Sequence, residues 1–282
     1  MSVDTEVRPE VVAEPSAPRR RMRIPRRVIV STTAMLILLG IWWAVAAAKI
    51  WDPVFVPSPV SVWDQLIRTS TEHDGVRGYG GYMLWEHLWV SVRRILLSSA
   101  IAVVIGIPIG IAIALVPLLN EAFGPAITFL RQLPPLAYFS LLIIWFGIDE
   151  TPKLVLLVIA AMPPIIVSTA VGIESVHKDY INGARSLGAS RLALIRFVLL
   201  PAALPDVFTG IRLGVGVAYT SVVAAETVNG VPGLGGMIRD AQRYNQTDLV
   251  VLGILVLGLT GLLLEGLLTW LQRRATPWRG LA

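Results

Sequence analysis

The stretch LVVLGILVLGLTGLLLEGLLTWL, residues Leu249–Leu271, decides the fold class because it is an almost uninterrupted apolar run of membrane-crossing length. An α-helix rises about 1.5 Å per residue and a hydrocarbon core is about 30 Å thick, so about 20 apolar residues span it. The run is too long for a membrane-spanning strand and does not alternate strictly between apolar and polar residues. Because a backbone in lipid must satisfy its hydrogen bonds internally, the run predicts a transmembrane helix.

Further runs share this length and character, and they are Val28–Ala48, Val90–Val116, Phe123–Phe146, Leu154–Ile173 and Asp206–Glu226. Across the 282 residues, 55% are hydrophobic and only 15% are charged, which is too apolar for a soluble domain. The predicted fold class is therefore an all-α membrane protein with six transmembrane helices.

The run Phe123–Phe146 is interrupted by the segment Arg131-Gln132-Leu133-Pro134-Pro135. Prolines break the helical hydrogen-bond ladder, and a break at membrane depth is tolerated only where the backbone faces protein or water. An arginine at that depth is costly unless it is paired or faces a wet cavity. We therefore predict a translocation pathway nearby, with Arg131 sensing an anionic solute and Gln132 as a neutral hydrogen-bond partner. The alternatives are a proline kink made for packing and an arginine that reaches the cytoplasmic interface. The predicted pathway residues are Arg131, Gln132, Pro134 and Glu226.

The run Asp206–Glu226 carries small residues at Gly210 and Gly214. Small residues four apart lie on one helix face, which suits close helix packing or a subunit interface. Arg212 is six residues from Asp206, so the two do not share a helix face and no ion pair between them is expected. Glu265 in the last run is isolated, and we expect it to be a packing or interfacial residue rather than a proton carrier.

The basic residues predict the orientation of the chain. With the N-terminus in the cytoplasm, 15 of the 24 Lys and Arg residues fall in inner segments, six in outer segments and three at or inside helix ends. This distribution follows the positive-inside rule with both termini cytoplasmic. We predict that residues 1–27 form a disordered cytoplasmic tail. Residues 28–48 are predicted to be a membrane anchor, because the run is long for a signal peptide, even though the alanines at 46–48 resemble a cleavage site. Residues 90–272 predict a five-helix core, and residues 273–282 a cytoplasmic C-terminus.

The outer side of the predicted topology holds two polar segments. Residues 49–89 contain several prolines and predict an external loop with short interfacial helices. Tryptophans in this segment fit an aromatic belt better than a binding cage, and they are Trp51, Trp63, Trp85 and Trp89. The second segment includes Met237–Tyr244, which predicts a short amphipathic helix that forms part of a gate.

The inner side holds a loop at residues 174–205, which includes the basic stretch KDYINGARSLGASRLALIRFVLLPAALP from Lys178 to Pro205. It combines the small residues Gly183 and Ala184 with a helix stop at Gly188 and a helix cap at Ser190. We predict two short helices that form a docking surface, although a plain basic loop is the simpler alternative. The predicted docking residues are Tyr180, Asn182, Gly183, Ala184, Arg185, Ser186, Leu187, Gly188, Ser190 and Pro201.

The spacing from Asn182 through Gly188 and Val198 to Pro201 resembles the loop by which permease subunits of bacterial ABC importers engage their ATPase. The usual pattern is Glu-Ala-Ala-x3-Gly-x9-Ile-x-Leu-Pro, and here Asn182, Gly183 and Val198 replace the Glu, the first Ala and the Ile. The segments Leu130–Lys153, Arg185–Glu226 and Leu271–Gly280 also look like those of nitrate, sulfonate and taurine permeases. The likeness is greatest to taurine permeases.

This resemblance implies a type I ABC importer permease (MetI-like) fold in the bacterial cytoplasmic (inner) membrane, with a five-helix core and one added N-terminal helix. It also implies a second copy of this chain, two ATPase subunits that bind ATP and Mg, an external substrate-binding protein, and surrounding membrane lipid. The implied solute is taurine or another alkanesulfonate, with nitrate, bicarbonate or another small organic solute as the alternative. A secondary carrier is less well supported, since paired buried acids and inverted repeats are not evident.

Enzyme signatures are missing from the chain. No lysine follows a glycine, so there is no G-x4-G-K-[ST] phosphate loop, and we expect no cofactor bound by this chain. The histidines, His73, His87 and His177, are scattered and there is no cysteine, so no metal site is predicted and we expect exposed or interfacial side chains. Basic residues at the ends of apolar runs, without a continuous stripe, argue against binding to nucleic acid.

Overall fold

The structure, a computed structural model, describes residues 26–73, 75–228 and 232–278. The predicted tail, residues 1–27, lies outside these ranges except for its last two residues. In chain order the elements are α1 (Arg26–Ala47), α2 (Pro59–Ser70), β1 (Glu72–His73), β2 (Val76–Arg77), α3 (Leu84–Leu115), α4 (Pro117–Gln132), α5 (Pro135–Phe146), α6 (Glu150–Glu174), α7 (Lys178–Ser186), α8 (Arg191–Leu194), a π-helical segment η1 (Ile195–Leu199), α9 (Leu200–Glu226), α10 (Leu234–Arg243) and α11 (Thr247–Ala275).

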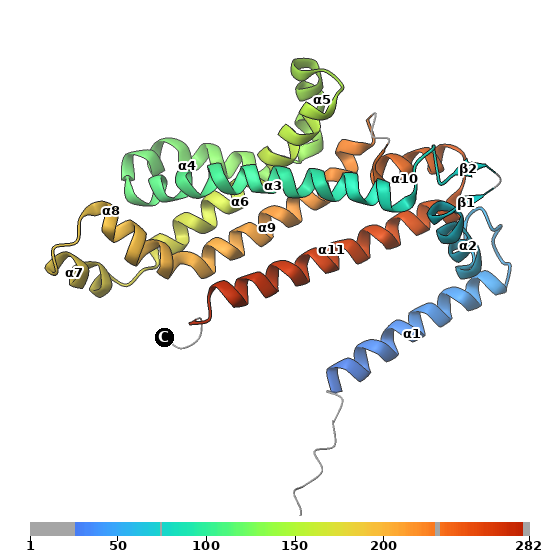
Figure 1. Cartoon of the computed structure of the whole chain (residues 1–282), viewed down its shortest axis with the longest axis horizontal. Helices are drawn as coiled ribbons and strands as arrows, with labels where there is room; N and C mark the ends of the chain where they lie inside the picture. Colours follow the sequence, from blue (N-terminus) through green and yellow to red (C-terminus); the bar gives the residue numbers. More distant parts are fainter. Residues whose placement is uncertain (1–25, 74, 229–231, 279–282) are drawn as a thin grey trace, which may run out of the picture.

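Long helices dominate the architecture, and α3, α6, α9 and α11 run along the long axis of the molecule (Figure 1). In the described part of the chain, four helical segments are long and apolar enough to cross a membrane. One of them joins α8, η1 and α9 into a single span, Arg191–Glu226. The predicted all-α membrane fold is confirmed, whereas the predicted count of six spans is not established, because α1 contributes only the shorter apolar helix Thr32–Ala47.

The predicted break in the third run is confirmed. The axes of α4 and α5 meet at 101°, and the pair counts as a fifth span only if the two helices are taken together. Leu133 and Pro134 lie between them with extended backbone, and Pro135 begins the second helix. As a result, α5 projects away from the bundle (Figure 1).

The helices extend beyond the apolar runs that predicted them. The second run begins at Val90, but α3 begins at Leu84, and the run Leu154–Ile173 lies inside α6, which starts at Glu150. The predicted start at Asp206 is also too late, because α9 begins at Leu200. Apolar composition marks the part of a helix in hydrocarbon, whereas helical hydrogen bonding continues into polar flanks.

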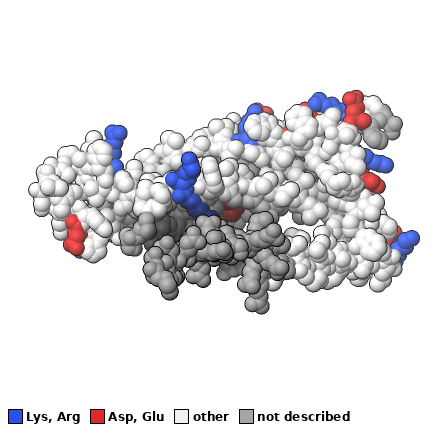
Figure 2. Space-filling view, turned by 60° about the horizontal axis from the view of Figure 1, so that its bottom comes forward, with Lys and Arg blue, Asp and Glu red and all other residues white. Residues whose placement is uncertain are grey.

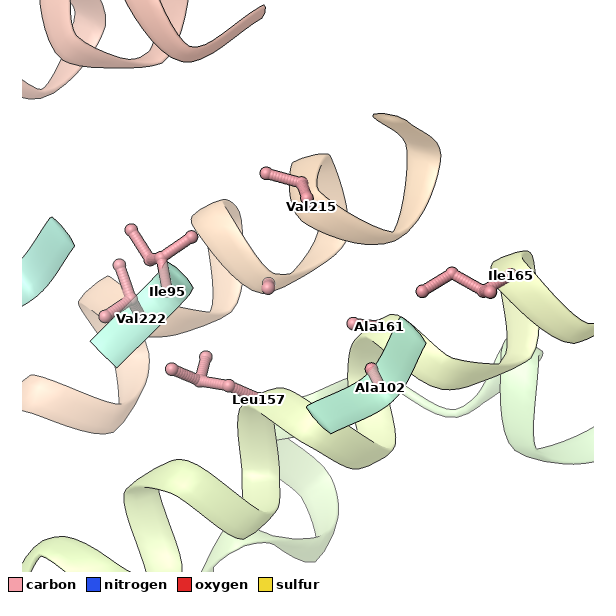
Figure 3. Close-up of a cluster of buried hydrophobic side chains, with 8 residues drawn as sticks. Ile95, Ala102, Leu157, Ala161, Ile165, Val215 and Val222 are labelled. Atoms are coloured by element: carbon pink, nitrogen blue, oxygen red, sulfur yellow. The ribbon is translucent and has the colours of Figure 1, made fainter. Parts of the chain in front are cut away.

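The central core lies between α3, α6 and α9. Side chains from all three helices meet there (Figure 3), and the buried set comprises Ile95, Ala102, Leu157, Ala161, Ile165, Val215, Ala218 and Val222. Alanines at several of these positions let the helix axes approach closely.

Glycines bring α9 against α6. A Cβ on Gly214 would lie 2.7 Å from the carbonyl oxygen of Ala161, and a Cβ on Gly210 would lie 2.6 Å from the Cβ of Ser168. Both distances are shorter than any van der Waals contact, so only glycine fits. The predicted small-residue face is therefore confirmed as a site of close helix packing.

The two ends of the bundle carry different short elements. In Figure 1, α7 and α8 lie at one end, and α2, the β1–β2 hairpin and α10 lie at the other. The hairpin is antiparallel and pairs Glu72 with Arg77. At this second end, Trp42 Nε1 donates a hydrogen bond to the Pro57 carbonyl at 3.0 Å, which ties α1 to the segment before α2. The face seen in Figure 2 is largely uncharged, as expected of a surface in contact with lipid.

We expect Gly214→Ala to lower the thermal unfolding temperature in detergent, because the new methyl group meets backbone of α6 and overpacking costs about 1–3 kcal/mol. Gly216→Ala is the matched control, since a Cβ at Gly216 meets nothing within 4 Å. Tryptophan fluorescence during heating measures both variants. Equal unfolding temperatures would show that the α6–α9 contact is not as tight as described.

Candidate functional site

The predicted helix stop and cap in the inner loop are both present. α7 ends at Ser186, and Gly188 adopts a left-handed backbone with φ of 81°. The Gly188 N–H donates to the Arg185 carbonyl at 2.9 Å, which closes the end of the helix. The Ser190 hydroxyl then accepts a hydrogen bond from the Ala193 N–H at 3.2 Å and caps α8.

The surface of α7 and α8 exposes large apolar side chains. Leu187 is 90% exposed, Leu192 73% and Tyr180 64%. Gly183 is open, since a Cβ there would meet nothing within 4 Å. Further predicted docking residues are exposed on the same segment, and they are Asn182, Arg185, Ser186, Gly188 and Ser190. We call this set, Tyr180 to Leu192, the α7–α8 surface.

Ala184 and Pro201 are less exposed than the rest of the predicted docking set. Ala184 is half-buried and packs against a cluster within this chain that includes Ile173, Val176 and Leu194. Pro201 is half-buried in the first turn of α9, directly after the π-helical segment η1. The small side chain of Ala184 therefore allows α7 to sit close to its own bundle.

Three of the four predicted pathway residues lie together at the bend between α4 and α5. Arg131 and Gln132 form the last turn of α4, Pro134 precedes α5, and all three are exposed. Among the described residues, no carboxylate lies within ion-pair distance of Arg131. The bend therefore presents a guanidinium that is available to an anion.

Glu226 lies in a different environment, at the buried end of α9. Its carboxylate accepts from Arg94 Nη1 at 2.7 Å, from Ser91 Oγ at 2.7 Å, and from the Gly235 N–H at 2.8 Å. Its side chain is 0% exposed. The structure thus separates Glu226 from the group at the bend.

Arg94 is the centre of this buried network, which we call the Arg94 cluster and define as Ser91, Arg94, Glu150, Lys153 and Glu226. The guanidinium is 3% exposed and donates to both oxygens of Glu150, through Nε at 2.7 Å and Nη2 at 2.5 Å. Lys153 Nζ lies 3.3 Å from the same carboxylate. Two cations and two carboxylates balance in charge, and of these side chains only Glu150, 46% exposed, reaches solvent to a large extent.

The Arg94 cluster joins four parts of the chain. It links α3 to the start of α6, to the end of α9 and, through the Gly235 N–H and the Leu234 N–H bond to Ser91 Oγ, to the start of α10. Ala225, next to Glu226, belongs to an apolar cluster with Phe139 and Leu142 of α5. The last turn of α9 is therefore held between α5 and the Arg94 cluster.

The expectation of an exposed or interfacial His87 is wrong, because its side chain is fully buried. Nδ1 accepts from the Gly233 N–H at 3.1 Å, and Nε2 lies 3.1 Å from the Tyr79 carbonyl, so the tautomer with hydrogen on Nε2 satisfies both contacts. The sequence contains one signal that His87 belongs to a polar face of its helix. His87, Ser91 and Arg94 follow an i, i+4, i+7 spacing, which places polar groups on one face of an apolar helix.

Metal binding is not supported in the described residues, where no group of three or more His, Cys, Asp or Glu side chains could hold an ion.

Comparison with known proteins gives a consistent result. The family described as "Binding-protein-dependent transport system inner membrane component" matches residues 106–277, more than half of the chain. The chain is 42% identical to the taurine transport system permease protein TauC of Escherichia coli K12, and the match covers 92% of this chain and 93% of TauC. It is 33% identical to the nitrate import permease protein NrtB of Leptolyngbya laminosa over 95% and 99% of the two chains. It is 35% identical to the bicarbonate transport system permease protein CmpB of Synechococcus elongatus, over 68% of this chain and 69% of CmpB.

A solved structure shares the fold. An inward-facing MetNI methionine ABC transporter contains a chain that superposes with a TM-score of 0.61 at 19% identity, over 68% of this chain and 97% of that one. This likeness supports the type I importer permease fold predicted from the sequence.

We expect Arg94→Gln to destabilise the protein by about 3–5 kcal/mol, because Glu226 would remain buried without a cation. Arg93→Gln is the matched control, since Arg93 is exposed on the same helix and should change stability by less than about 0.5 kcal/mol. The double variant Arg94→Gln/Glu226→Gln should regain part of the lost stability, because the unpaired buried carboxylate is removed. Thermal unfolding of the four proteins in detergent measures this, and equal losses for Arg94→Gln and Arg93→Gln would contradict it.

Proposed function

The chain belongs to the family of binding-protein-dependent transport system inner membrane components, the permease subunits of ABC importers, and we propose that its solute is taurine or another alkanesulfonate. The observation that carries this proposal is the identity of 42% to a taurine permease over 92% of the chain, against 33% and 35% for nitrate and bicarbonate permeases. Import of nitrate or bicarbonate is the second candidate.

The proposed complex contains two copies of this chain, two ATPase subunits and an external substrate-binding protein. ATP and Mg bind to the ATPase subunits, and this chain contributes no cofactor site. The α7–α8 surface supports the ATPase contact, because a patch of exposed Leu and Tyr side chains at one end of a helical bundle is typical of a protein interface. Both termini then lie in the cytoplasm with this surface, and α2, the β1–β2 hairpin and α10 lie outside.

Movement of the ATPase subunits would reach the membrane through one helical path. α8, η1 and α9 are continuous, so a displacement of the α7–α8 surface acts directly on α9. α9 carries that displacement to α6 through the contacts at Gly210 and Gly214, and to α10 through the Arg94 cluster. Closure of the ATPase subunits on ATP would switch the paired permeases from inward-open to outward-open.

Arg131 is the proposed contact for the solute. A guanidinium matches the geometry of a sulfonate oxygen pair as it matches a carboxylate or phosphate. Gln132 beside it provides an amide that both donates and accepts. The exposed position of both side chains at the α4–α5 bend supports this role.

We expect Leu187→Asp to abolish co-purification of the ATPase subunit, because it places a charge in the centre of the α7–α8 surface. Val76→Asp is the matched control. Val76 is an exposed apolar residue, 63% accessible, in β2, and β2 lies at the opposite end of the molecule from α7 (Figure 1). Affinity purification of the tagged permease from membranes, followed by quantification of the ATPase, measures the effect. Equal amounts of ATPase with both variants would exclude the proposed docking surface.

We expect cells that carry the complete importer to take up radiolabelled taurine, and Arg131→Gln to reduce the rate by about ten-fold or more through loss of a charge-assisted contact. Arg131→Lys should retain part of the rate, and ATPase co-purification should be unchanged in both variants. Absence of taurine uptake by the wild type would reject the solute. Full uptake by Arg131→Gln would reject only the role of this side chain.

A further inference from the structure

A polar cavity of about 480 Å³ lies between α9 and α11, away from the α4–α5 bend and the Arg94 cluster. Its lining includes Arg212 from α9 and Thr269, Gln272 and Arg273 from α11. Arg212 also lines a second, narrower space of about 120 Å³, whose other walls include Val215, Tyr219, Leu264 and Leu268. The charged chamber and a mostly apolar slot, which Glu265 also lines, therefore share Arg212 and lie along the same pair of helices.

Polar contacts join α9 to α11 beside these two spaces, in addition to the apolar packing of Leu268 against the central core. Arg212 Nη1 donates to Gln272 Oε1 at 3.0 Å, and Arg212 also pairs with Glu265. Gln272 Nε2 donates to the Pro205 carbonyl at 3.1 Å. Farther along, the Tyr219 hydroxyl donates to the Leu257 carbonyl. These bonds fix the position of α11 relative to α9 beside the two spaces.

The chamber lies at the depth of lipid headgroups. The last turns of α11 carry Arg273 and Arg274 after a long apolar stretch, and Trp270 and Trp278 nearby are 57% and 43% exposed. Tryptophan and arginine together mark the boundary between hydrocarbon and water. The slot, in contrast, extends along α11 toward the apolar middle of the helix.

The charge of the chamber is positive. Glu265 is occupied by Arg212, and among the described residues no carboxylate lies within ion-pair distance of Arg273. Basic pockets between transmembrane helices at the headgroup level are suited to anionic lipids. We propose that this chamber binds the phosphate headgroup of an anionic phospholipid, with one acyl chain lying in the slot between α9 and α11.

The proposal concerns a lipid and not the transported solute, so its test is independent of the proposed function. A small free anion such as phosphate would share the chemistry of the chamber. It would not fill the slot, whose walls are mostly apolar.

The test is lipid retention by the full-length protein, measured by native mass spectrometry after incubation with phosphatidylglycerol or phosphatidylcholine. We expect the wild type to retain phosphatidylglycerol in preference to phosphatidylcholine, and Arg273→Gln to reduce that retention by about five-fold. Arg274→Gln is the matched control, because it removes the same charge from the adjacent residue, which does not line the chamber. Equal retention of the two lipids by the wild type, or equal losses in the two variants, would overturn the proposal.

A second pair of variants separates a lipid from a free anion. Gly216 lines the slot and a Cβ there meets nothing within 4 Å, so Gly216→Leu should fill the slot and lower phosphatidylglycerol retention. Gly266→Leu on α11 is its control, since Gly266 is equally open and does not line the slot. Undiminished retention in Gly216→Leu, or displacement of the lipid by millimolar inorganic phosphate, would identify a headgroup-sized ion site and reject the proposed acyl-chain slot.

Discussion

The close contact of α6 with α9 is the interaction on which the rest of the structure depends. Lipid is as apolar as the side chains of a transmembrane helix, so there is little hydrophobic force to bring two such helices together. Association instead requires close approach, and Gly210 and Gly214 provide it by admitting the backbone of α6. α3 joins the pair through Gly110, where a Cβ would lie 2.7 Å from the Ile166 carbonyl oxygen. A compact three-helix unit follows, and α4, α5 and α11 are arranged around it.

Polar contacts add to the glycine contacts at two places on α9. At its last residue Glu226 is fixed by Arg94, and in its middle Arg212 reaches Glu265 and Gln272 on α11. In a low-dielectric medium an ion pair stabilises the structure only if its hydrogen bonds are satisfied. Removing one partner leaves a buried charge without a counter-charge, which is strongly destabilising. The Arg94–Glu226 pair is almost closed to solvent, whereas the Arg212 contacts line an open chamber.

The sequence predicts the local features of this structure well and the long-range ones poorly. The break before Pro135, the helix stop at Gly188 and the cap at Ser190 each follow from the chemistry of one or two residues, and each is present. Arg94 and Glu226, in contrast, are 132 residues apart in the chain, and no local sequence pattern predicts that they form an ion pair. The burial of His87 depends on backbone groups of Gly233 and Tyr79, which carry no side-chain signal. The orientation of Ala184 toward its own bundle is equally a property of the packed state, since spacing alone gives only the helix face.

The segment between the α7–α8 surface and α9 has a physical reason to bend. Pro201 has no N–H, and its ring excludes the ordinary helical position of the carbonyl four residues before it. The chain responds with the π-helical turn Ile195–Leu199, in which the Leu200 N–H bonds to the Ile195 carbonyl five residues back. Such wider turns weaken the helical ladder and often mark functional hinges. Pro205 removes another donor one turn later, and Gly172 of α6 faces Asp206 so closely that a Cβ would lie 2.8 Å away. The departures from regular α-helical hydrogen bonding therefore lie in residues 195–205, and from Asp206 onward the close contact with α6 holds α9 in place.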